Sequence, residues 1–266
     1  MTPIDADSEE TWPEEIRAAL SGRQVQIQSF QAERARIDRA AQEDVMLRIH
    51  RPANQYQQAW DEVLEISEKA TAGKRLVGFH CTRITETERA DVEANGLCKL
   101  TSALFERRLQ CVLSEGHISD DVAAALRFRN QVDEPNRTGV ICFCFNRDLL
   151  SHESGVERLF RSWGGEALYN SHEDDKATGP ALAAIGLPCI VVASLPINEV
   201  WAYHTVGQRL VNLWCAKRDI TTGEDGNFEG RIKTDLSGDN ILRVIGYDDP
   251  EFLRLTEHSK WRDPLR

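Results

Sequence analysis

Strongly apolar, strand-like segments are few in this chain and lie far apart at irregular intervals. They occupy residues 75–82, 138–145, 188–195 and 240–246, and no internal repeat relates them. A doubly wound parallel sheet needs strands that alternate regularly with helices, so this spacing favours an α+β fold instead. The change in character near Gly73 predicts a helical N-terminal region, residues 1–72, followed by an α+β domain, residues 73–266.

Helix start and stop signals fill the long intervals between these segments. Three stretches have the spacing of a capping box, in which a Ser or Thr side chain caps a helix three residues before a Glu. They are Thr11–Glu14, Thr85–Glu88 and Ser154–Glu157. The second, with Gly96 as a stop, predicts a helix over 86–95; further helices are expected over 102–115 and 119–130. The glycine-containing segment 221–230 is expected to be a loop.

The first 70 residues read as an acidic tail followed by helices with partial apolar stripes. Such a region either braces the rest of the fold or offers a surface to a regulator or antitoxin. The chain of 266 residues carries a formal net charge of −11, which disfavours electrostatic binding to duplex nucleic acid over a large surface. No apolar run reaches the ~18 residues of a membrane helix, and the acidic start is unlike a secretory signal. We therefore expect a cytoplasmic protein that does not enter membranes.

The seven cysteines have no pattern typical of a disulfide framework or a zinc site. Most lie in apolar segments, which is typical of free thiols packed as small apolar side chains in a reducing compartment. Cys142 and Cys144 are two apart in a strand-like segment, so both thiols are expected on one face. No metal site is predicted. Motifs for phosphate-binding glycine loops, nucleophile elbows and metalloprotease helices are also absent from the sequence.

Two clusters of residues have the chemistry of a site. The first is His80, Thr82 and Arg83, at the end of an apolar strand, where an imidazole can bond a hydroxyl and a guanidinium can hold phosphate. The second runs from Trp163 to Tyr169. In it, Gly164 and Gly165 would allow backbone to approach a flat ligand beside Trp163, while Glu166 and Tyr169 would share a helical face. Each cluster also has a plain structural interpretation, as core and surface residues.

The order of these pieces resembles the ADP-ribosyltransferase fold, in its His–Tyr–Glu branch. That family begins its core with a strand ending in histidine, commonly followed by a small residue and Thr, as in His80-Cys81-Thr82 here. A helix ending in a Gly-Leu pair follows, here Gly96-Leu97, then a second strand and a helix bearing a tyrosine, here Tyr169. The resemblance implies a split β-sheet core carrying an N-terminal helical region and helical insertions.

The same resemblance implies a function and roles for residues. NAD would be the substrate that donates ADP-ribose to a macromolecular acceptor, protein or nucleic acid, in a toxin or defence effector. His80 would bind the nicotinamide ribose, with Tyr169 stacking on nicotinamide. The family's catalytic glutamate opens a late strand, but the late strand expected here begins near Asp239 without a Glu. Glu166 or Asp239 would then supply the carboxylate.

Two other classes of function remain open from the sequence. One is a different pocket enzyme, a hydrolase or nuclease that uses His80 and Glu166. The other is a non-enzymatic interaction protein whose N-terminal helices bind a partner.

Overall fold

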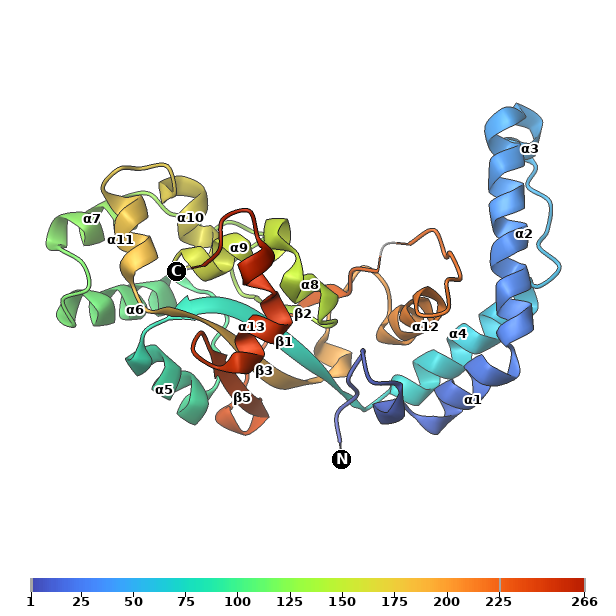
Figure 1. Cartoon of the computed structure of the whole chain (residues 1–266), viewed down its shortest axis with the longest axis horizontal. Coiled ribbons are helices and arrows are strands. Elements are labelled where there is room, and N and C mark those ends of the chain that lie inside the picture. Colours follow the sequence, from blue (N-terminus) through green and yellow to red (C-terminus); the bar gives the residue numbers. More distant parts are fainter. Residues whose placement is uncertain (1, 225, 266) are drawn as a thin grey trace. The chain divides into compact units, whose positions relative to one another are not determined.

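The computed structural model describes residues 2–224 and 226–265, which form helices and one five-stranded sheet (Figure 1). The described residues divide into two compact units. The first contains 2–76, 196–198, 202–224 and 226; the second contains 77–195, 199–201 and 227–265. The first unit thus combines the N-terminal region with a later segment of the chain. Within the described ranges, no helix has the length and apolar character needed to cross a membrane.

The first unit is helical. Its helices are α1 (Glu14–Gly22), α2 (Gln24–Glu43), α3 (Val45–Ile49), α4 (Gln57–Thr71) and α12 (Val206–Ala216). Helices α4 and α12 approach closely because Gly207 has no side chain: a Cβ there would lie 2.7 Å from the Ser67 carbonyl carbon. The capping box expected at Thr11 is wrong. α1 has Pro13 at its N-cap, and the Thr11 hydroxyl instead donates to the carbonyl of Ser8.

The sheet of the chain has the strand order β4-β2-β1-β3-β5. The strands are β1 (Arg75–Ile84), β2 (Ile141–Cys144), β3 (Leu187–Pro196), β4 (Glu229–Ile232) and β5 (Ile241–Gly246). The four strands expected from apolar runs are all present. β4 is new, because it falls inside the segment expected to be a loop. It pairs with β2 in antiparallel register, with Cys144 opposite Glu229 and Ile141 opposite Ile232.

The central strand β1 and its neighbour β2 meet over a short ladder. Their antiparallel register joins Phe79 to Cys144. β2 begins at Ile141 and β1 continues to Ile84, so this register keeps residues 80–82 of β1 alongside β2, and β1 runs past β2 only from Arg83. His80 is the next residue of β1 after the pair, and this is the place where the candidate site lies.

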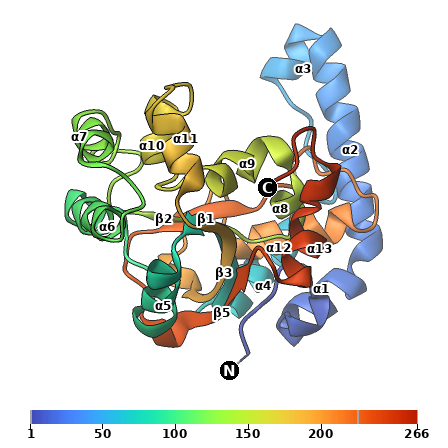
Figure 2. The same cartoon turned by 60° about the vertical axis from the view of Figure 1, so that its left-hand side comes forward.

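One face of the sheet carries the larger apolar core. Val77, Phe79 and Cys81 of β1 pack there with Ile190 and Val192 of β3. Three helices and the C-terminal segment cover this face: α8 (Asp148–Ser151), α9 (Glu153–Arg161) and α13 (Pro250–Thr256), the last followed by Trp261 and Leu265 (Figure 2). The capping box expected at Ser154 is wrong, since the N-cap of α9 is His152, two residues earlier, and it makes no side-chain cap.

A second core joins the helices that lie between the strands in sequence. They are α6 (Ser102–Ser114), α7 (Asp120–Phe128), α10 (Glu166–His172) and α11 (Thr178–Ala184), which group together in Figure 1. Leu109, Leu126, Leu168 and Leu182 are fully buried between them, with Trp163. α5 (Glu86–Asn95) precedes this group and begins with the expected capping box at Thr85 and Glu88. Short 3-10 helices occupy Glu9–Thr11, Ile197–Glu199, Gly238–Asn240 and His258–Lys260.

Candidate functional site

His80 lies in β1 at the position opposite Phe143 of β2. Its ring is half-buried beside Phe143, and Nδ1 lies 2.9 Å from the main-chain carbonyl oxygen of Cys142. Burial lowers the pKa of His80; the Cys142 carbonyl opposes this shift, and the positive charge of Arg108 adds to it. The ring is therefore neutral at pH 7. Because a carbonyl only accepts hydrogen bonds, the proton is on Nδ1, and Nε2 has a free lone pair.

Cys142 is the residue around which charged side chains gather. Its side chain retains solvent access, but the protein atoms around the sulfur raise the pKa of its thiol by desolvation. The negative charges of Glu166 and Glu229 raise this pKa further, while the nearby Arg231 lowers it. His80 meets the same residue at its carbonyl. The strand registers place the Cys142 thiol, Glu229 and Arg231 on the face of the sheet that carries Phe79, whereas His80 points to the other face and meets Cys142 only at its main-chain carbonyl.

Glu166 and Tyr169 lie on α10 and face one another, as the three-residue spacing predicted. Glu166 is exposed, and its Oε2 lies 3.4 Å from Nε of Arg137. Tyr169 is only 5 % exposed, and burial together with the charge of Glu166 raises the pKa of Tyr169. The guanidinium of Arg158 covers the tyrosine ring, 4.0 Å from its centroid. A nicotinamide ring could not stack on Tyr169 in this arrangement, so that expected role needs correction.

Glu229 and Arg231 are site residues that the sequence analysis missed. The register of β4 against β2 places Glu229 opposite Cys144 and Arg231 opposite Cys142, so both side chains share a face. Glu229 is exposed and forms no ion pair with the described residues. The signal in the sequence was weak: Phe228, Gly230 and Ile232 alternate with the charged positions, but a glycine-containing segment of four residues also fits a loop.

Arg83 is not available to a ligand, which corrects its expected role as a phosphate-binding residue. It is 7 % exposed. Its Nε donates to the carbonyl of Ile185 at 2.8 Å and one terminal nitrogen donates to the carbonyl of Phe160 at 3.1 Å. The guanidinium thus satisfies two buried carbonyls at the ends of elements that pack on β1. Thr82, one residue earlier, is half-buried on the opposite side of the strand.

The Trp163 cluster is also structural where ligand contact was expected. Trp163 is 1 % exposed, and its indole nitrogen donates to Oε2 of Glu88 at 2.9 Å. Gly164 and Gly165 have φ of +85° and +62°, a conformation that favours glycine, and they turn the chain into α10. A Cβ at Gly164 would lie 2.3 Å from Leu168 Cδ1. These glycines therefore shape a turn rather than bring backbone to a ligand.

Asp239, the other carboxylate considered for catalysis, lies in the 3-10 helix Gly238–Asn240. The first residue of that helix packs closely on the end of α5, where a Cβ on Gly238 would lie 2.4 Å from the carbonyl oxygen of Ala94. Its strand β5 is at the far edge of the sheet, separated from β1 by β3. Glu229, on β4, is separated from β1 only by β2, where His80 bonds.

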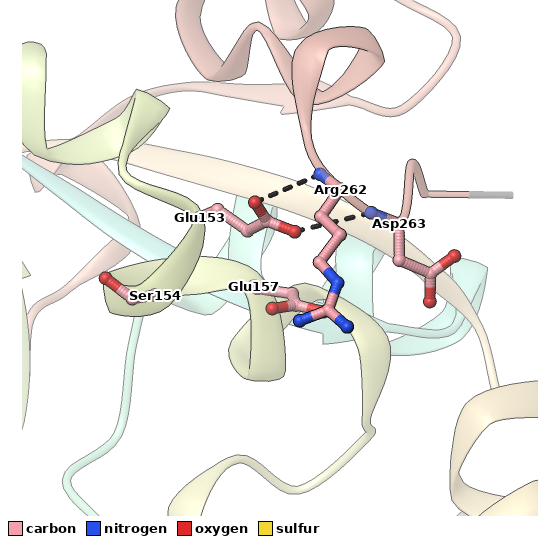
Figure 3. A pocket seen from close by; sticks show the side chains of 5 residues that line it. All are labelled: Glu153, Ser154, Glu157, Arg262 and Asp263. Carbon is pink, nitrogen blue, oxygen red and sulfur yellow. Dashed lines mark hydrogen bonds between the residues drawn. The ribbon is translucent and has the colours of Figure 1, made fainter.

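Two surface pockets lie outside this cluster. One, of about 510 Å³, is lined by Glu153, Ser154, Glu157, Arg262 and Asp263 (Figure 3). There the Glu153 carboxylate accepts hydrogen bonds from the backbone nitrogens of Arg262 and Asp263, so it fixes the C-terminal segment to α9. The other, of about 440 Å³, is lined by residues around Thr85, His117 and Leu187. Neither contains a site residue expected from the sequence.

No protein-family model, curated protein or solved structure matches this chain.

Proposed function

We propose that this protein is an NAD-dependent ADP-ribosyltransferase that modifies a macromolecular acceptor. The observation that carries the proposal is the neutral imidazole of His80, which is fixed by its hydrogen bond to the main chain of β2. Its Nε2 is a hydrogen-bond acceptor, as binding of a ribose hydroxyl requires. This matches the role that the family resemblance implies for the histidine of the first core strand.

The carboxylate is assigned to Glu229. The resemblance implies a glutamate at the start of a late strand, and Glu229 is the first residue of β4. Its charge acts on the Cys142 thiol, while His80, whose ring points to the other face of the sheet, bonds the main-chain carbonyl of the same residue. Glu166 acts on Cys142 as well, but it is paired with Arg137 and lies against Tyr169. A carboxylate without an ion pair among the described residues, as Glu229 is, is the better group to stabilise developing positive charge.

The reaction follows from these groups. The bond between nicotinamide and its ribose breaks, nicotinamide leaves with the bonding electrons, and positive charge develops on the ribose. A negative carboxylate near the ribose lowers the energy of this oxocarbenium-like state, as carboxylates do in glycoside hydrolysis. A nucleophile of the acceptor then forms the new bond to the ribose and gives up its proton. Without an acceptor, water takes its place and the products are nicotinamide and ADP-ribose.

Release of nicotinamide from NAD by the full chain is the direct test. We expect slow release that depends on protein concentration, together with a rise in melting temperature on adding NAD or ADP-ribose, because a ligand of the native state stabilises it. A chain that neither releases nicotinamide nor is stabilised by NAD is not this enzyme. Cleavage of RNA, DNA or an ester by the same preparation, lost in His80→Ala, would instead favour the nuclease or hydrolase.

A further inference from the structure

The outer edge of β4 is bridged by Trp201. Trp201 and Arg231 form an isolated antiparallel bridge, in which the backbone nitrogen of each donates to the carbonyl of the other, at 2.8 and 2.9 Å. Residues directly opposite one another in an antiparallel pair point to the same face of a sheet. Arg231 is also opposite Cys142 of β2. The side chains of Trp201, Arg231 and Cys142 therefore share one face.

Trp201 is a large aromatic side chain that stays open to solvent. It is 57 % exposed. Lys233, the next residue after the end of β4, lies over the indole with its ammonium nitrogen 4.1 Å from the ring centroid. This contact orients the ring and leaves more than half of the side chain uncovered. An exposed tryptophan held in this way can stack on another flat ring.

Two cations beside this ring have no acidic partner. Neither Arg231 nor Lys233 forms an ion pair with the described residues, and both have access to solvent. Glu199, two residues before Trp201, instead accepts a hydrogen bond from the Thr234 hydroxyl. Arg231 and Lys233 are two residues apart, about 6.6 Å along an extended chain. Two accessible, unpaired cations in a chain of net charge −11 indicate an anionic ligand.

A flat aromatic ring next to two successive cations matches a single-stranded nucleic acid. Unpaired bases stack on aromatic side chains, and phosphates of neighbouring nucleotides accept hydrogen bonds from guanidinium and ammonium groups. An acidic peptide could use the cations, but its carboxylates offer no ring to Trp201. A duplex keeps its bases stacked inside and needs a large basic surface, which the net charge disfavours. A single strand needs only this small patch.

We propose that Trp201, Arg231 and Lys233 bind a single-stranded nucleic acid, and that this strand is the acceptor of ADP-ribose. The acceptor role rests on the proposed function, which assigns the carboxylate to Glu229, two residues before Arg231 on the same face. A hydroxyl or base nitrogen of the bound strand takes the place of nicotinamide on the ribose of NAD. Nicotinamide leaves with the bonding electrons, and the attacking group gives up its proton to water.

Fluorescence anisotropy tests the surface without NAD, with the full chain and a labelled single strand of about ten nucleotides, as RNA and as DNA. We expect Trp201→Ala to bind about ten-fold more weakly, because a base loses its stacking partner, and Trp201→Phe to bind nearly as well as wild type. Arg231→Gln and Lys233→Gln should each weaken binding. Each should also reduce the slope of log affinity against log salt by about 0.7, since one phosphate contact is lost.

Two exposed residues elsewhere provide matched controls. Phe128 on α7 is an aromatic side chain that is 93 % exposed, and Lys176 is an exposed lysine without an ion pair among the described residues. Phe128→Ala and Lys176→Gln should bind as wild type. No binding by the wild type, or equal binding by it and all variants of the surface, overturns the proposal. An acidic peptide that competes equally well, and still binds Trp201→Ala, would identify a protein partner and overturn it too.

The mass of the strand after incubation with NAD and the full chain tests its role as acceptor. We expect the strand to gain one ADP-ribose with the wild type and far less with Trp201→Ala. Release of nicotinamide without a modified strand overturns the acceptor role and leaves the proposed function standing. If no nicotinamide is released, the proposed function fails and the acceptor role with it, while the binding measured without NAD still decides whether this surface holds nucleic acid.

Discussion

Nδ1 of His80 and the carbonyl oxygen of Cys142 lie 2.9 Å apart, although the two residues are 62 positions apart in the sequence. This bond between β1 and β2 fixes the ring, its tautomer and the direction of Nε2. The two nitrogens therefore have separate tasks under the proposed function: Nδ1 donates to a strand carbonyl, and Nε2 is the acceptor proposed for a ribose hydroxyl. Substitutions that mimic one nitrogen at a time can separate these tasks.

His80→Asn keeps an amide nitrogen near the position of Nδ1 and removes Nε2. We expect its melting temperature to stay close to wild type while nicotinamide release falls about ten-fold or more, because the ribose hydroxyl loses its acceptor. His80→Gln places its amide near Nε2 and leaves the Cys142 carbonyl unpaired, so it should lose more stability than His80→Asn. Scanning calorimetry and a nicotinamide assay measure both effects. Wild-type turnover in His80→Asn would remove Nε2 from the reaction.

Glu229→Gln removes the charge assigned to catalysis and keeps the shape of the side chain. We expect nicotinamide release to fall by about 10²-fold or more with little change in melting temperature, since the carboxylate is exposed. Glu166→Gln is the matched comparison, because it also changes the charge around Cys142. It should have the smaller effect on turnover. The reverse order in a side-by-side rate measurement would return the catalytic role to Glu166.

Arg83→Met tests the structural role found for Arg83. Two buried carbonyls, those of Ile185 and Phe160, lose their donor in this variant. We expect the free energy of unfolding to fall by about 2–3 kcal/mol, the cost of leaving buried polar groups unpaired. Affinity of the folded protein for ADP-ribose should not change. Urea unfolding and calorimetric titration measure the two quantities; weaker binding with unchanged stability would reinstate Arg83 as a ligand contact.

Stability should fall as the pH is lowered through the range in which free histidine titrates. His172 is buried on α10, with Nδ1 2.9 Å from the Thr178 hydroxyl and Nε2 bonded to the carbonyl of Arg129. Burial lowers the pKa of His172, as does the Arg129 guanidinium, while the Arg129 carbonyl and Asp175 oppose the shift. The unfolded chain then binds more protons than the folded one, and the stability present at pH 7 is lost progressively below about pH 6.5.

Thermal unfolding between pH 7.5 and 5 measures this loss. His80 and His258 shift in the same direction, so they contribute to the same slope. His172→Gln should unfold at a lower temperature at pH 7.5 and depend less on pH. His50→Gln, which changes an exposed histidine, serves as the control and should follow the wild type. An equal pH dependence in His172→Gln and wild type would show that His172 does not contribute.

Local patterns in the sequence were enough to predict much of the fold. The Thr85–Glu88 capping box and the long apolar runs of β1 and β3 are present as predicted. Hydrogen bonds within four residues, and apolar surface that must be buried in any fold, determine these elements. The sequence also indicated His80 and Glu166 as candidate site residues. A polar residue that lies among apolar residues, or at the end of an apolar segment, can be recognised from the sequence alone. Their chemical roles remain predictions.

Only the tertiary structure decided where the long side chains go. Arg83 and Arg108 both lie next to apolar residues in the sequence. In the structure, Arg83 donates to two buried carbonyls, whereas Arg108 has a buried nitrogen without a partner among the described residues. β4 exists because β2 supplies its hydrogen-bond partners, so Glu229 became a strand residue through pairing with a segment more than 80 positions away. Such partners are chosen by packing between distant segments. No window of the sequence contains both members of the pair.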